Sequence, residues 1–281
     1  MLKRKQITVI GLVVVLMGLL LSLDIKGLVK EEGQHANGAA AATAAPAQSI
    51  TVESVSETAK QGLNSNLEKQ VSDLEANLKA APENQKVQFQ KQLSQLWDDV
   101  NQPAPAALYM EAVAEKESSF SNWLKAGDLF AAAYQNTQDS LIQPSLTQKA
   151  ANAYKQALKL EPNNLAAKTG LGVAYVNGAA SPMQGIQLLL EVVKEDPSNT
   201  NANLNLGLFS MKSGQFDKAV ARFKTVIENK PSPEVWFYLA SSFESLGEKA
   251  EAIAAYKKSE ELAANPNLTK FVENKIIELS K

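Results

Sequence analysis

Residues Thr200 to Pro231 read TNANLNLGLF SMKSGQFDKA VARFKTVIEN KP, and this stretch decides the fold. Apolar residues recur every three or four positions on both sides of a turn at Gly214, which predicts two amphipathic helices. Gly207 belongs to the first helix and Phe223 to the second. Pro231 ends the second helix, because proline lacks an N–H and disfavours helical angles in the residue before it. The stretch therefore predicts a helical hairpin.

The same pattern occurs four times between residues 119 and 266. A bulky residue recurs at steps of 35, 34 and 33 residues, at Tyr154, Leu189, Phe223 and Tyr256. A small residue keeps the same steps, at Ala150, Gly185, Ala219 and Ala252. Periodicity of this length marks a repeat architecture in which each unit is one supersecondary structure.

The small residues explain how the two helices of a hairpin approach each other. A second set of them lies in the first helix of each copy, at Gly127, Gly172, Gly207 and Ala240. We expect the bulky residue to lie one turn beyond the small one in the second helix, where it fills space against the next hairpin. The earliest copy is longer by an insertion around 136–144. We expect a solvated loop there, with Leu141 and Ile142 available for a partner contact as the alternative.

On these residues the chain resembles the tetratricopeptide repeat (TPR) family. The resemblance implies an all-α fold, a right-handed superhelix of antiparallel helix pairs, with repeats at 119–162, 163–197, 198–231 and 232–266. It also implies a concave wall of first helices that binds a peptide or a partner helix. The family's usual contact positions fall on Leu124, Asp128, Thr169, Val173, Val176, Asn177, Asn201, Leu204, Leu208, Met211, Lys212, Phe237, Ser241 and Glu244. This set lacks the basic clamp with which chaperone-associated TPR domains hold a terminal carboxylate, which disfavours that cytosolic role.

The first 30 residues predict a signal anchor. Lys3-Arg4-Lys5 precede an uncharged run at 7–23, which as a helix is just long enough to cross a bilayer. The alternative is a cleaved signal peptide, but small residues are missing just after the run. The basic cluster at Lys3-Arg4-Lys5 then stays in the cytoplasm, and the chain after residue 23 lies on the other side of the membrane. In a bacterium this predicts a single-pass inner-membrane protein with a periplasmic TPR domain, tethered by a flexible Ala-rich linker at 31–50.

The segments flanking the clear repeats also have helical patterns. Residues 51–81 predict one amphipathic helix, because apolar residues from Val52 to Leu78 are three or four apart. It could cap the N-terminal end of the repeats, form a homodimer through residues 52–78, bind a membrane partner, or fill the groove. Residues 82–118 predict a degenerate TPR-like helix pair, and residues 267–281 a C-terminal capping helix.

Composition excludes several classes of function. The chain contains no cysteine and one histidine, His35 in the predicted linker, so we expect no metal site and no cofactor. No catalytic arrangement is visible, and we expect a protein that is not an enzyme. Acidic residues outnumber basic ones after residue 30, which disfavours nucleic-acid binding.

The sequence thus predicts a membrane-anchored, extracytoplasmic TPR scaffold whose partners are other proteins or peptides. One hypothesis is chaperone-like binding of exported polypeptides in the concave groove. The other is a structural or assembly subunit of one membrane or envelope complex, including the adaptors used in cofactor assembly.

Overall fold

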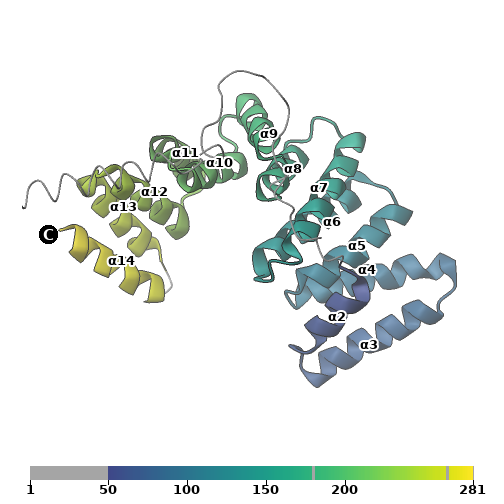
Figure 1. Cartoon of the computed structure of the whole chain (residues 1–281). Coiled ribbons are helices and arrows are strands. Elements are labelled where there is room, and N and C mark those ends of the chain that lie inside the picture. The colour runs from purple at the N-terminus through teal and green to yellow at the C-terminus, as the bar shows by residue number, and fades with distance from the viewer. Residues whose placement is uncertain (1–49, 179–180, 264–265, 281) are drawn as a thin grey trace, which may run out of the picture. The chain divides into compact units, whose positions relative to one another are not determined.

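The described part of the chain is entirely helical (Figure 1). The structure is a computed structural model that describes residues 50–178, 181–263 and 266–280, except the side chains of residues 267 and 268. The helices are α2 (Val52–Lys60), α3 (Ser65–Ala80), α4 (Glu83–Asp99), α5 (Pro103–Lys116), α6 (Phe120–Asn136), α7 (Gln143–Leu160), α8 (Leu165–Asn177), α9 (Pro182–Glu195), α10 (Thr200–Lys212), α11 (Phe216–Asn229), α12 (Pro233–Leu246), α13 (Lys249–Leu262) and α14 (Pro266–Leu279).

Helices α4 to α13 form five consecutive hairpins. The pairs are α4 with α5, α6 with α7, α8 with α9, α10 with α11, and α12 with α13. Each hairpin from α6 onward coincides with one of the four sequence-predicted repeats, and the first is the expected degenerate pair. Local signals fix the starts of the first helices: Asn164, Asn199 and Ser232 accept hydrogen bonds from backbone N–H groups of the following turn.

The insertion in the first clear repeat mostly lengthens helices. Helices α6 and α7 have 17 and 18 residues, whereas α10 and α11 have 13 and 14. The predicted long loop is therefore wrong for part of its range, because α7 begins at Gln143 with Pro144 in its first turn, where proline is tolerated. Leu141 remains in the connection and is exposed.

Small and large residues pack as complementary pairs within each hairpin. A Cβ atom added at Gly127 would lie 2.7 Å from the Tyr154 ring, and one at Gly207 would lie 2.5 Å from the Phe223 ring. The bulky side chain thus lies on the first helix of its own hairpin. Tyr154 also lies against Gly170 of the next hairpin, as expected. Because two consecutive hairpins meet on one ring, its volume helps to set their spacing.

Residues 51–81 form two helices, so the prediction of a single one is wrong. Helix α2 ends at Lys60, and α3 begins at Ser65 after Gly62. The Asn64 side chain accepts hydrogen bonds from the N–H groups of the first turn of α3, which favours a new helix start there. Helix α3 packs on α4 and α2 packs on α5, which agrees with a cap on the first helix pair.

The buried apolar residues of the described chain form three clusters. The N-terminal cluster extends from α2 to α8 and includes Trp97, Phe130 and Tyr154. The middle cluster is small and centres on Leu189 and Leu206, which belong to α9 and α10. A C-terminal cluster covers α11 to α14; it contains Phe223 and Tyr256, and Val272 of α14 is fully buried in it. Helix α14 therefore covers the last hairpin, as predicted.

No described helix has both the length and the apolar character that a membrane span requires. The predicted signal anchor, its transmembrane helix at 7–23 and most of the linker at 31–50 lie outside the described residues.

Candidate functional site

The predicted binding positions come together best on α10. Leu204, Leu208 and Met211 follow one another at steps of four and three residues, so they lie on the same face of the helix. All three are half-buried and pack against the C-terminal cluster. Asn201 and Lys212 are exposed at the two ends of this helix. The result is an apolar strip with polar ends that retains solvent-accessible carbon surface; we call Leu204, Leu208 and Met211 the α10 strip.

Two predicted positions on α12 are used for internal packing. The centroid of the Phe237 ring lies 5.7 Å from the centroid of the Phe271 ring in α14. Glu244 accepts a hydrogen bond of 2.7 Å from the Tyr256 hydroxyl and forms a 2.9 Å ion pair with Lys275 of α14. Helix α14 therefore occupies this part of the first-helix surface; residues 52–78 were one alternative for filling the groove.

The ionisation of Glu244 reflects these contacts. Burial alone would raise the pKa of Glu244, but the hydrogen bonds from Lys275 and Tyr256 outweigh it and lower the pKa below the usual value. The same contact raises the pKa of Lys275. Ionised Glu244 thus helps to hold α14 against the last hairpin.

Thr169, another predicted binding residue, offers little surface to a partner. Its side chain is buried, and its hydroxyl donates a 2.8 Å hydrogen bond to the carbonyl of Leu165.

Asp128, a predicted binding residue on α6, accepts a 2.9 Å hydrogen bond from the hydroxyl of Tyr154. Partial desolvation by the surrounding atoms raises the pKa of Asp128, although its side chain keeps an exposed surface.

The remaining predicted positions are spread over separate hairpins. Leu124 packs against the N-terminal cluster, and Val173 packs against the middle cluster. Val176, Asn177 and Ser241 are half-buried on α8 and α12. The structure therefore joins the α10 strip and Phe237 in one cluster, but it does not join all fourteen positions in one surface.

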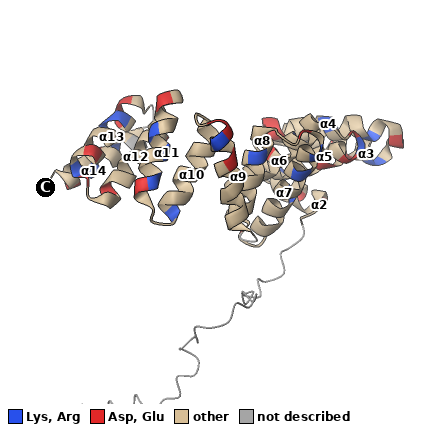
Figure 2. Cartoon of the chain, turned by 90° about the horizontal axis from the view of Figure 1, so that it is seen from above, with Lys and Arg blue, Asp and Glu red and all other residues tan. Residues whose placement is uncertain are grey.

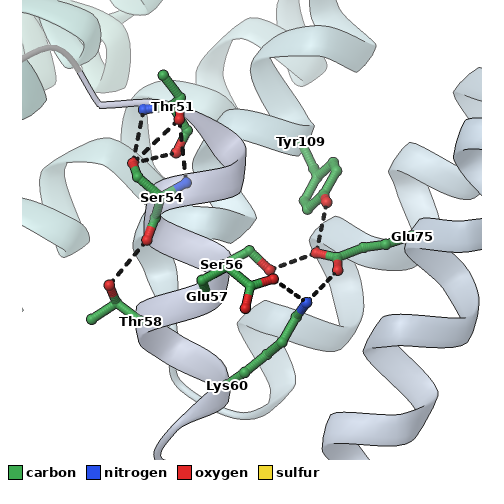
Figure 3. Close-up of polar contacts among 8 residues, drawn as sticks. All are labelled: Thr51, Ser54, Ser56, Glu57, Thr58, Lys60, Glu75 and Tyr109. Atoms are coloured by element: carbon green, nitrogen blue, oxygen red, sulfur yellow. Dashed lines mark hydrogen bonds and ion pairs between the residues drawn. The ribbon is translucent and has the colours of Figure 1, made fainter.

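A polar cluster between α2, α3 and α5 was not predicted (Figure 3). Glu75 of α3 accepts hydrogen bonds from Ser56 and from the Tyr109 hydroxyl, and its second oxygen lies 2.6 Å from Lys60 Nζ. Burial, then the nearby Glu75 carboxylate, raise the pKa of Tyr109 far above its usual value, so the phenol stays protonated and donates. One signal in the sequence could have indicated this cluster. Glu75 is a charged residue that lies among the regularly spaced apolar residues of 51–81.

Acidic and basic residues are mixed along the helices (Figure 2). The described residues contain no group of His, Cys, Asp and Glu side chains that could hold a metal ion.

Comparisons with known proteins agree with this architecture. Residues 210–267 match the tetratricopeptide repeat family model, which spans the end of α10, the whole of α11 to α13 and the start of α14. Residues 210–267 therefore contain tetratricopeptide repeat sequence, and the helical hairpins before them share its architecture. Helix α10, which carries the α10 strip, is the first helix of its hairpin. The resemblance to the TPR family assigns ligand contacts to this first helix.

Among the solved structures with a similar fold are two TPR proteins. A thermophilic TPR protein of Thermus thermophilus is 20% identical, with a TM-score of 0.53; the match covers 68% of this chain and 99% of that one. A tetratricopeptide repeat protein from Parabacteroides merdae is 16% identical, with a TM-score of 0.55; the match covers 80% of this chain and 83% of that one. No curated protein matches this sequence. At these identities the likeness establishes the TPR fold alone.

Proposed function

We propose that this protein is a membrane-anchored, extracytoplasmic TPR scaffold that binds segments of other proteins on the α10 strip. The observation that carries the proposal is the partial exposure of Leu204, Leu208 and Met211 on one helix face. Apolar side chains at this spacing fit an amphipathic helix or an extended apolar segment, and methionine adapts to varied shapes. Of the two roles left open by the sequence, chaperone-like binding of exported polypeptides is the one proposed.

Purification of the tagged full-length chain from cells tests the binding surface. We expect Leu208→Glu to reduce recovery of co-purifying proteins, because it puts a charge into an apolar contact. Leu160→Glu is the matched control, since Leu160 is 48% exposed on α7, away from the strip. Equal recovery with both variants would contradict the proposed surface.

The identity of the recovered proteins distinguishes the two roles. Many exported proteins, each in small amount and each lost with Leu208→Glu, are expected for a chaperone-like binder. One partner in stoichiometric amount would instead assign the chain to a structural or assembly subunit of a single complex.

The anchor is proposed from the uncharged run at 7–23 and the basic residues before it. Because the chain contains no cysteine, a single Lys230→Cys variant gives one labelling site at an exposed position. In cells with a permeabilised outer envelope, we expect a membrane-impermeant maleimide to label this cysteine, and carbonate washing to leave the chain in the membrane fraction. Labelling only after lysis would contradict an extracytoplasmic location.

A further inference from the structure

A groove opens where α9, α10 and α11 meet. Its volume is about 750 Å³, and its walls are α9 and α11, with the end of α8 at its edge and α10 between the walls. Helix α9 packs on α10 less extensively than the second helices of the neighbouring hairpins pack on the helices that follow them. This loose junction leaves room for another segment.

One wall of the groove is apolar. Met183, Ile186 and Leu190 of α9 recur at steps of three and four residues and form a single stripe. Met183 is 70% exposed and Leu190 is 43% exposed, which leaves large apolar side chains in water. Leu206 and Phe209 of α10 continue the apolar surface at the base of the groove. Burial of this stripe by a partner would be favourable.

The opposite wall is basic. Lys218 and Arg222 lie one turn apart on α11, and Lys212 stands at the end of α10. The Arg222 Nη1 atom donates a 3.0 Å hydrogen bond to Asn203 Oδ1, which orients the guanidinium and uses one of its five donor N–H bonds. None of the described residues that line the groove is acidic, although the whole chain has a net charge of −2. The groove therefore differs in charge from the rest of the molecule.

We propose that this groove binds an amphipathic helical segment of a partner protein that carries acidic residues along one edge. Its apolar face lies on the α9 stripe, and its acidic edge faces Lys218 and Arg222. The two walls differ in chemistry, which fixes both the rotation of the bound helix and the sign of its charge. The inference rests on the proposed scaffold role and adds to it a second binding surface, beside the α10 strip.

A designed peptide provides the probe. It is a labelled 16-residue helix with leucines at positions i, i+3, i+4 and i+7 and glutamates along one flank, compared with a scrambled peptide of equal composition. The full-length chain is placed in phosphatidylcholine nanodiscs, with empty nanodiscs as the background, and binding is followed by fluorescence anisotropy. We expect saturable binding of the designed peptide that is at least roughly tenfold tighter than binding of the scrambled one.

Variants then test each wall. Leu190→Asp is expected to weaken binding by roughly tenfold or more, whereas Leu262→Asp, at a site 48% exposed on α13, should leave it unchanged. Lys218→Glu should weaken binding several-fold, and a peptide with lysines in place of the glutamates should recover it on this variant alone. Leu208→Glu, which tests the α10 strip, should not change binding of this peptide.

Three results would overturn the inference. Equal affinity for the designed and the scrambled peptides would show that the groove has no preference for an amphipathic helix. Insensitivity to both Leu190→Asp and Lys218→Glu would place binding elsewhere. Displacement of the peptide by laurate at lower concentration than by unlabelled peptide would assign the groove to a lipid. The α10 strip is tested separately by Leu208→Glu, so any of these failures is distinguishable from failure of the scaffold function.

Discussion

Single glycines control how closely the helices of a hairpin approach. Gly207 has no side chain where a Cβ atom would lie 2.5 Å from the Phe223 ring, and Gly127 has the same relation to Tyr154. The rings belong to the hydrophobic clusters and are fully or almost fully buried. They have little freedom to move away, because protein interiors are close-packed.

Gly207→Ala is therefore expected to destabilise the protein by about 1–3 kcal/mol, the usual cost of overpacking. The decrease in the midpoint of urea denaturation measures it. Gly62→Ala is the matched control, since its Cβ atom would meet only the Ala59 carbonyl oxygen at 3.7 Å. Phe223→Leu in the Gly207→Ala background should recover part of the loss, as Leu189 already pairs with Gly172 in the preceding hairpin. Equal stability of the two alanine variants would contradict this role for Gly207.

The contact of Glu244 with α14 predicts a dependence on pH. The folded-state pKa of Glu244 lies below its unfolded value, which is about 4.3. Its contribution to stability is therefore present above that pH and is lost as the pH falls through the folded-state pKa. We expect the stability advantage of the wild type over Glu244→Gln to disappear in this acid range, as followed by urea denaturation at several pH values. An advantage that stays constant down to pH of about 3 would contradict it.

At the scale of elements, the hairpins of 119–266 could be predicted because small residues, bulky residues and prolines all recur in one frame. The break between α2 and α3 could not be predicted from periodicity, because Ala59, Leu63 and Leu67 continue the four-residue spacing across it. Gly62 and the cap at Asn64 mark the break, but they lie between apolar residues and do not interrupt the pattern.

The candidate site was predicted in part for a similar reason. Family positions fall on a half-exposed face of α10 at Leu204, Leu208 and Met211, whose part in binding stays a prediction. Another of these positions is Thr169, whose side chain is buried. The family positions give no sign that α14 covers Phe237, since that contact depends on tertiary packing. The groove beside α9 exists because two hairpins pack loosely on each other. Local sequence patterns do not predict how tightly two hairpins pack.

Glu75 is expected to hold α2 on the first helix pair. Glu75→Ala removes the acceptor of Ser56 and Tyr109 and one partner of Lys60, at a cost of about 1–3 kcal/mol. Because α2 packs mainly on α5, we expect faster amide hydrogen exchange in α2 and unchanged exchange in α11 to α13. The control is Glu57→Ala, since Glu57 is 74% exposed and also contacts Lys60. Equal exchange in α2 for both variants would show that the buried cluster does not anchor it.

At the scale of the whole described chain, three separate clusters imply that stability is distributed along the repeats. In repeat proteins each unit depends mainly on its neighbours. Phe130→Ala is therefore expected to speed hydrogen exchange chiefly in α4 to α8, and Phe223→Ala chiefly in α10 to α13, by the loss of buried apolar contacts. A uniform increase along all helices with either variant would instead indicate one cooperative unit.

The central claim is that partner proteins bind on the α10 strip, and crosslinking in living cells tests it most directly. A photoreactive amino acid replaces Leu208 in one strain and Leu160, the exposed control on α7, in another. We predict crosslinks to exported polypeptides from position 208 and few from position 160, as read by mass spectrometry. Crosslinks from position 208 only to residues of the same chain, or equal yields from both positions, would contradict the account.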